Sequence, residues 1–162
     1  MREVFLYAYL AGLVGSIFMD VTENYFSKKG ISSGVKVNHI GRWFLGMLKG
    51  NFKHKDIDTS AVMNHEIKAG MFFHYVLAGG GIAFLYPILL YITGLGLNVN
   101  HIMYATVFGF LTNVFPWFWM MPSFGWGIAG LKKPSKSETV VAPTLSHLMY
   151  GLGLGLTLTV FY

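Results

Sequence analysis

The 162-residue sequence contains no cysteine, and only 12% of its residues are charged. The absence of cysteine excludes disulfides, thiolate metal ligands and a cysteine nucleophile. An average soluble domain has about 25% charged residues, so half that proportion is typical of a membrane protein. The H-E-x-x-H, G-x-S-x-G and P-loop motifs, which would indicate familiar enzyme classes, are also missing. What the chain does have is a high content of hydrophobic (54%) and aromatic (17%) residues.

Four apolar segments are long enough to cross a hydrocarbon core, which takes about 20 helical residues. They cover residues 4–26, 66–93, 101–121 and 139–162. The first does not have the composition of a signal peptide, because only Arg2 beside Glu3 precedes it and no cleavage site follows. We therefore predict an all-α bundle of four transmembrane helices that forms one integral membrane domain over residues 1–162.

Lysine and arginine are distributed unevenly between the predicted loops. Eleven of the twelve lie between spans one and two, at the start of span two, or between spans three and four, and only Arg2 lies on the other side. Basic loops stay in the cytoplasm, so this bias predicts that both termini face outward. It also accounts for the net charge of +5 without nucleic acid as a partner. The expected partner is the lipid bilayer.

The long first loop contains an amphipathic pattern over residues 40–49. The apolar residues at helical spacing are Ile40, Trp43, Phe44, Met47 and Leu48. This pattern predicts a short helix on the cytoplasmic face, with Trp43 at the membrane interface. A helix packed over the mouth of the bundle is the alternative.

Small residues and prolines mark the places where the predicted helices pack closely or bend. Gly151 and Gly155 form a G-x-x-x-G pair, which lets two helix backbones approach each other. The pair is equally compatible with packing inside the chain and with a homo-oligomer. Pro87, Pro116 and Pro143 are expected to kink their helices.

Each predicted span contains one polar residue at a similar depth. These residues are Asp20, His74, Asn113 and His147. At 1.5 Å per residue, each lies roughly 9–12 Å below the cytoplasmic end of its helix. An ionisable group left in lipid costs about 2.5–3.5 kcal/mol, so we expect these side chains to turn toward one another. The pattern predicts one shared polar site, open to the cytoplasm.

Helical spacing adds further residues to this site. Glu66 and His74 lie on one face of span two, with Gly70 between them. The candidates for a ligand, metal or proton site are His74, His147, Glu66 and Asp20. The expected supporting residues are Asn113, Glu23, Asn24, Tyr150 and His65.

Five interpretations fit this set of side chains. Two imidazoles with carboxylates suit divalent zinc, iron or manganese, and two facing histidines can ligate haem iron. An Asp/Glu/His chain open to one side can carry protons or a proton-linked small substrate. The set can also be a structural network without a ligand, or the active site of a membrane-embedded enzyme. We expect a binding or transport role, and the alternative is a metal-dependent enzyme acting on a lipid-like or quinone-like substrate.

A series of short pieces occurs in a fixed order along the chain. It consists of Gly41-Arg-Trp43, Gly50-Asn-Phe-Lys-His54, Glu66, Gly70, His74-Tyr75, Gly109, Pro116, Pro122, Gly125, Gly127, Ala129, Pro134, His147 and Gly151. In these pieces the sequence resembles a bacterial membrane family catalogued as domain of unknown function 2938. The resemblance extends over nearly the whole chain. It implies a four-span protein of the bacterial inner membrane, and it implies no activity, substrate or cofactor.

Overall fold

The computed structural model describes residues 2–162, in which every regular element is a helix. Four helical segments are long and apolar enough to cross a membrane. They are Glu3–Ser27, Glu66–Ile92, His101–Ser123 and Glu138–Phe161. These bounds agree with the four predicted spans to within two residues at each end. The predicted all-α, four-span fold is therefore confirmed.

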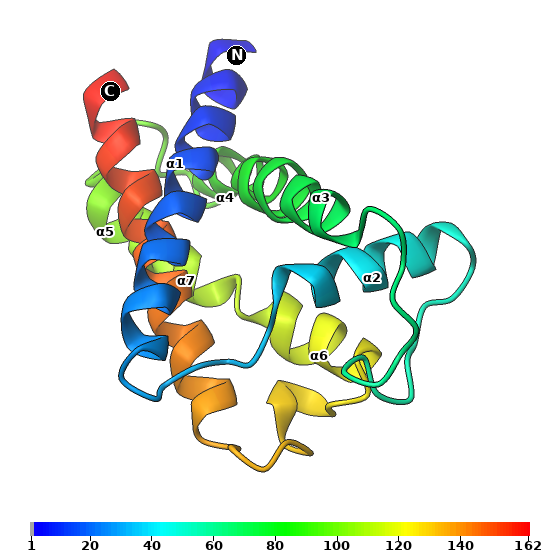
Figure 1. Ribbon diagram of the computed structural model, residues 1–162. Coiled ribbons are helices and arrows are strands. Elements are labelled where there is room, and N and C mark those ends of the chain that lie inside the picture. The colour runs from blue at the N-terminus through cyan, green and yellow to red at the C-terminus, as the bar shows by residue number, and fades with distance from the viewer. Residues whose placement is uncertain (1) are drawn as a thin grey trace.

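The first and last helices form the most extensive helix pair of the bundle. α1 (Arg2–Ser27) packs along α7 (Glu138–Phe161), and both termini lie at the same end of the molecule (Figure 1). α5 (His101–Leu111) packs against α7. A Cβ atom added at Gly151 or Gly155 would collide with backbone carbonyl oxygens of α5. The G-x-x-x-G pair is thus used inside the chain, and a homo-oligomer through small-residue helix faces stays a prediction.

Spans two and three are not continuous α-helices. Span two consists of α3 (Glu66–Met71), the π-helical segment η1 (Phe72–Gly81) and α4 (Leu85–Ile92). Span three consists of α5, the π-helical segment η2 (Pro116–Met120) and the short α6 (Met121–Ser123). Pro116 has no N–H to donate, so the hydrogen-bond ladder of α5 cannot run through it. π-Helical turns are rare and are frequently found at functional sites.

The amphipathic pattern of the first loop forms α2 (Val37–Leu48), which packs on α3 (Figure 1). The two backbones touch at Gly41 and Gly70: a Cβ atom on Gly41 would collide with the carbonyl oxygen of Glu66. Glycine is required at this crossing because any side chain would push the helices apart.

Trp43 on α2 is only 1% exposed, so its predicted place at the membrane interface is wrong. It is covered by residues of the same loop and of the segment that follows η2. These residues are Ile57, Met121, Phe124 and Trp126. The aromatic side of α2 faces protein because the 49–65 loop and the 121–126 segment fold back over it. α2 is therefore a helix packed onto the bundle, as in the alternative interpretation.

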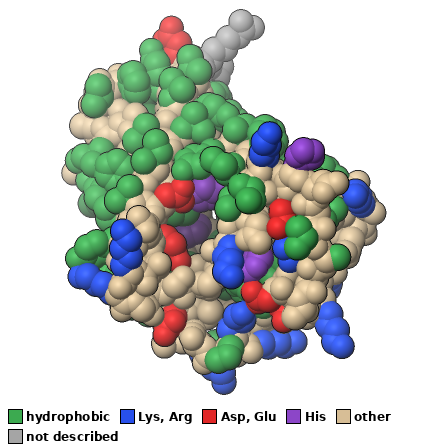
Figure 2. Space-filling model, in the orientation of Figure 1, with side chains coloured by type: hydrophobic (Ala, Val, Ile, Leu, Met, Phe, Trp, Pro, Cys, Tyr) green, Lys and Arg blue, Asp and Glu red, His purple; other side chains and the backbone are tan. Residues whose placement is uncertain are grey.

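Charged and apolar side chains occupy different parts of the surface (Figure 2). Hydrophobic side chains cover the half that carries the two termini, and most lysines and arginines gather at the opposite end. A bilayer requires this separation, because apolar side chains belong at lipid depth and basic groups outside it.

Candidate functional site

A cavity of about 620 Å³ lies between the spans. Its wall is mostly apolar and aromatic and comes from α1, α2, η1, η2, α7 and the loop after α1. Figure 2 shows acidic and histidine side chains around a hollow in this region of the surface. Pockets for drug-sized ligands measure about 300–1,000 Å³, so the cavity has the volume of a small-molecule site.

The first polar group on the wall joins α1 to η1. Nε2 of His74 lies 2.9 Å from Oδ1 of Asp20, and the hydroxyl of Tyr75 donates to Oδ2 of the same carboxylate. The neighbours His74 and Tyr75 both reach one carboxylate, and both lie in the π-helical segment η1. The carboxylate accepts, so Nε2 of His74 carries the hydrogen. Neutral His74 therefore keeps Nδ1 as its free acceptor.

The second polar group is the carboxylate of Glu23, one helical turn from Asp20. It accepts hydrogen bonds from both the amide and the hydroxyl of Ser33, each at 3.0 Å. The hydroxyls of Ser32 and Ser146 donate at 3.3 and 3.2 Å. These donors come from the loop after α1 and from α7, so Glu23 ties three parts of the wall together.

The third polar group is His147 of α7 with Thr112 at the end of α5. The hydroxyl of Thr112 lies 2.6 Å from the carbonyl oxygen of Gly109 and 2.7 Å from Nδ1 of His147. A hydroxyl has one hydrogen, and the carbonyl oxygen can only accept. Thr112 therefore donates to Gly109, and Nδ1 of His147 donates to Thr112. Neutral His147 keeps Nε2 as a free acceptor.

The structure brings most of the predicted site residues to this cavity. Asp20, His74, His147, Glu23 and Tyr150 all line it. The hydroxyl of Tyr150 donates to the carbonyl oxygen of Gly79 at 2.6 Å, which holds α7 against η1.

Three supporting residues lie elsewhere. Asn113 is buried outside the cavity wall, and its amide donates to the carbonyl oxygen of Phe110 in the same span at 2.8 Å. The neighbouring Thr112 lines the cavity and contacts His147, whereas the prediction named Asn113 as the supporting residue of this span. Asn24 and His65 are exposed and do not line the cavity.

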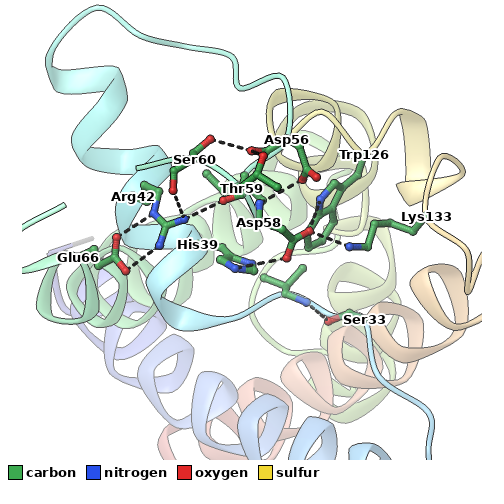
Figure 3. A network of polar contacts seen from close by, with 12 residues as sticks. Ser33, His39, Arg42, Asp56, Asp58, Thr59, Ser60, Glu66, Trp126 and Lys133 are labelled. Atoms are coloured by element: carbon green, nitrogen blue, oxygen red, sulfur yellow. Dashed lines mark hydrogen bonds and ion pairs between the residues drawn. The ribbon is translucent and has the colours of Figure 1, made fainter. Parts of the chain in front are cut away.

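Glu66 is not on the cavity wall, because Arg42 of α2 holds it (Figure 3). Nε and Nη2 of Arg42 donate to the two carboxylate oxygens at 2.8 and 2.9 Å. Nη1 of Arg42 donates to the carbonyl oxygens of Ile57 and Ser60 at 2.8 and 3.0 Å. Arg42 and Glu66 are 4% and 8% exposed, so this is a buried, bidentate ion pair that fastens α2 and its loop to span two.

Across residues 2–162 no three histidine, aspartate or glutamate side chains come together as a metal site would require. The set of metal ligands suggested by the sequence is incomplete, because the carboxylate of Glu66 is bound by Arg42. A zinc, iron or manganese site has no support in this part of the chain. Haem ligation by His74 and His147 stays a prediction.

The sequence analysis missed Tyr75, Thr112 and Arg42. Tyr75 and Thr112 are immediate neighbours of the predicted His74 and Asn113. Tyr75 lines the cavity together with His74, whereas Thr112 lines it and Asn113 does not. The helical spacing of residues 40–49 gave α2 an apolar face, but Arg42 lies off that face, so the pattern gave no signal for its role. The sequence does not show that α2 docks on Glu66.

A second polar network lies in the loops beside α2 (Figure 3). Asp58 accepts from Lys133 at 2.8 Å and from the indole of Trp126 at 3.2 Å, and Nε2 of His39 lies 3.6 Å away. Burial would raise the pKa of Asp58, but Lys133, His39 and Trp126 together hold it below its ordinary value. This network joins the 49–65 loop to the 124–133 segment.

Acidification from pH 7 to pH 5 is expected to destabilise this loop region. Burial lowers the pKa of His39 and of His54 below the ordinary 6.5, and the charge of Arg42 lowers both further. Lys36 and Lys133 also disfavour protonated His39, whereas Asp58 favours it. The unfolded chain takes up protons near pH 6.5 and the folded chain does so only at lower pH, so stability is lost as pH falls through this window.

Melting temperatures at pH 7 and pH 5 test this prediction. The double variant His39→Gln/His54→Gln should lose part of the pH dependence while retaining the fold. An unchanged difference between the two pH values in this variant would contradict the assignment.

Fold and site together define a class: a small helical protein with four spans that could cross a membrane, built around a mostly apolar cavity with a few polar groups. A family model described as a protein of unknown function (DUF2938) matches residues 9–161. The chain therefore belongs to the DUF2938 family. No curated protein and no solved structure gives a significant match.

Proposed function

We propose that the protein binds an amphipathic organic molecule in the cavity and has a binding or transport role. The observation that supports this most directly is the make-up of the wall. Aromatic and aliphatic side chains form most of it, and Asp20, Glu23, His74 and His147 supply a few polar atoms. Small-molecule sites have this composition, because apolar surface gives affinity and a few polar groups fix orientation.

The size of the cavity argues against a purely structural network. Protein interiors are packed with few voids larger than a water molecule. A network that only fixes helix register would close around its own hydrogen bonds. Here the polar groups border about 620 Å³ of space instead.

We place the protein in the bacterial inner membrane with both termini outside. The Lys/Arg bias of the loops supports this orientation, as does the gathering of basic side chains at the end opposite the termini (Figure 2). In this orientation Asp20 and Glu23 lie near the cytoplasmic end of α1. The cavity is then loaded or emptied from the cytoplasmic half of the bilayer.

The Asp20–His74 pair supports a proton-linked step in this role. A carboxylate and an imidazole 2.9 Å apart can share or release a proton when a charged ligand arrives. No observation favours the alternative of a metal-dependent enzyme for lipid-like or quinone-like substrates.

Native mass spectrometry of the protein purified in mild detergent tests the proposal. We expect one tightly held organic molecule per chain. Ala78→Trp adds a large side chain to the cavity wall and should abolish its retention. Leu89→Trp is the matched control, because Leu89 lies in the same span, is 42% exposed and does not line the cavity. Equal retention by both variants would contradict the proposal.

A further inference from the structure

The polar side chains of the cavity wall offer hydrogen-bond acceptors to a ligand but not donors. Six wall residues carry hydroxyls, and each donates its hydrogen to the protein. They are Ser16, Ser33, Tyr75, Thr112, Ser146 and Tyr150. Their acceptors are carboxylates or backbone carbonyls, so none of these hydrogens is left for a ligand.

The ionisable residues of the wall add acceptors rather than donors. In their neutral forms His74 and His147 each use one N–H inside the protein and keep one free acceptor nitrogen. Asp20 and Glu23 contribute two carboxylates. Among the described residues no lysine or arginine lines the cavity. Protonation of His74 would cancel one of the two negative charges and leave the other.

Aromatic rings complete the wall. Trp43, Phe73 and Trp119 line the cavity from α2, η1 and η2. The face of an aromatic ring attracts a cation, most strongly for tryptophan. The indole N–H of Trp43 is buried and has no exposed surface, so it adds no donor to the cavity.

From this arrangement we infer that the ligand is an organic cation: an ammonium group on an apolar body. The inference rests on the proposed function and names the ligand class of the same cavity. An ammonium supplies donors to the free acceptor nitrogens of His74 and His147, and its positive charge is complementary to the carboxylates of Asp20 and Glu23. A quinone or a fatty acid offers acceptors only and would meet a wall of acceptors. The ammonium can belong to a free organic amine or to the head group of a lipid.

Three probes with one carbon skeleton test the charge preference: 4-phenylbutylamine, 4-phenylbutanol and 4-phenylbutanoate. Calorimetric titration of the purified protein should give the tightest binding for the amine and the weakest for the carboxylate. Short-chain phosphatidylethanolamine, compared with phosphatidylglycerol, separates the two sources of the ammonium. Competition by the former alone indicates a lipid head group, and no competition by either indicates a free amine.

Variants of the two carboxylates test the contacts. Asp20→Asn and Glu23→Gln should each weaken amine binding at least about tenfold, because each removes a charge-assisted hydrogen bond. Binding of the alcohol should change less than about twofold. Glu3→Gln, on the same helix but exposed and outside the cavity, is the control and should change neither. Glu23→Gln keeps the test valid if Asp20→Asn disturbs the fold.

Two results would overturn the inference. One is binding of the carboxylate as tight as that of the amine, and the other is equal weakening of amine and alcohol by the variants. If the alcohol or carboxylate binds and Ala78→Trp blocks it, the cavity is still a binding site and only the ligand class is wrong. If no probe binds and Ala78→Trp leaves the retained molecule unchanged, the proposed function itself fails.

Discussion

Replacing Arg42 with methionine is expected to lower the free energy of unfolding by about 3–5 kcal/mol. The variant leaves the buried carboxylate of Glu66 without its charged partner. The backbone N–H of Met63, at 3.0 Å, remains as a donor to it. The carbonyl oxygen of Ser60 also loses its donor, and that of Ile57 keeps only the backbone N–H of Ser60 at 3.4 Å. A buried charge without a partner is one of the most costly single changes in a protein.

Unfolding in detergent, followed by tryptophan fluorescence, measures this effect. The double variant Arg42→Met/Glu66→Met should recover much of the loss, because it removes the unpaired charge together with its partner. Lys133→Met is the matched control: its ion pair with Asp58 is about 30% exposed, so its loss should cost less than about 1 kcal/mol. A cost for Arg42→Met no larger than that for Lys133→Met would contradict the prediction.

Gly151→Ala is expected to destabilise the protein by about 3 kcal/mol, near the upper end of typical overpacking. The added methyl group would collide with the backbone of α5 at Ala105 and Thr106, and backbone cannot rotate away as a side chain can. α5 must therefore move. Because Thr112 directly follows α5, this movement should also disturb the hydrogen bond to His147.

Gly81→Ala is the control for this substitution. It also adds one methyl group to a helical glycine, but the nearest atom, the carbonyl oxygen of Val76, lies 3.7 Å from the new Cβ position, an ordinary contact. Its effect should stay below about 1 kcal/mol. Thermal unfolding measures the stabilities of the two variants. Equal stabilities would contradict the prediction, because α5 and α7 could then move apart at little cost.

The four spans could be predicted because the hydrophobic length of a helix is a local property. Each span is a run of apolar residues long enough for a bilayer, and no long-range contact is needed to recognise it. The docking of α2 could not be predicted in the same way. Its helical spacing was visible, but that Trp43 meets Met121 and Phe124 depends on how distant segments fold back.

The candidate site could be predicted only in part, for a similar reason. Depth along a helix follows from counting residues, and three residues that the count put in one layer, Asp20, His74 and His147, all line the cavity. The direction in which a side chain points depends on the turns between it and the helix end. The π-helical turns of η1 and the break before Pro116 alter that direction. In span three, a count from the cytoplasmic end passes through η2 before it reaches residues 112 and 113, and Thr112 rather than Asn113 meets His147.

The π-helical segment η1 also bears on why span two is so long. Span two has 27 residues, whereas about 20 suffice to cross a bilayer. A π-helical turn uses more residues than an α-turn for a similar advance along the axis, so a span that contains one needs extra residues to reach both surfaces. Deleting one residue between Phe72 and Gly81 would rotate the two ends of the span by roughly a quarter of a turn relative to each other. A variant that lacks one of these residues would still have a second span long enough to cross the membrane, but His74 would no longer align with Asp20.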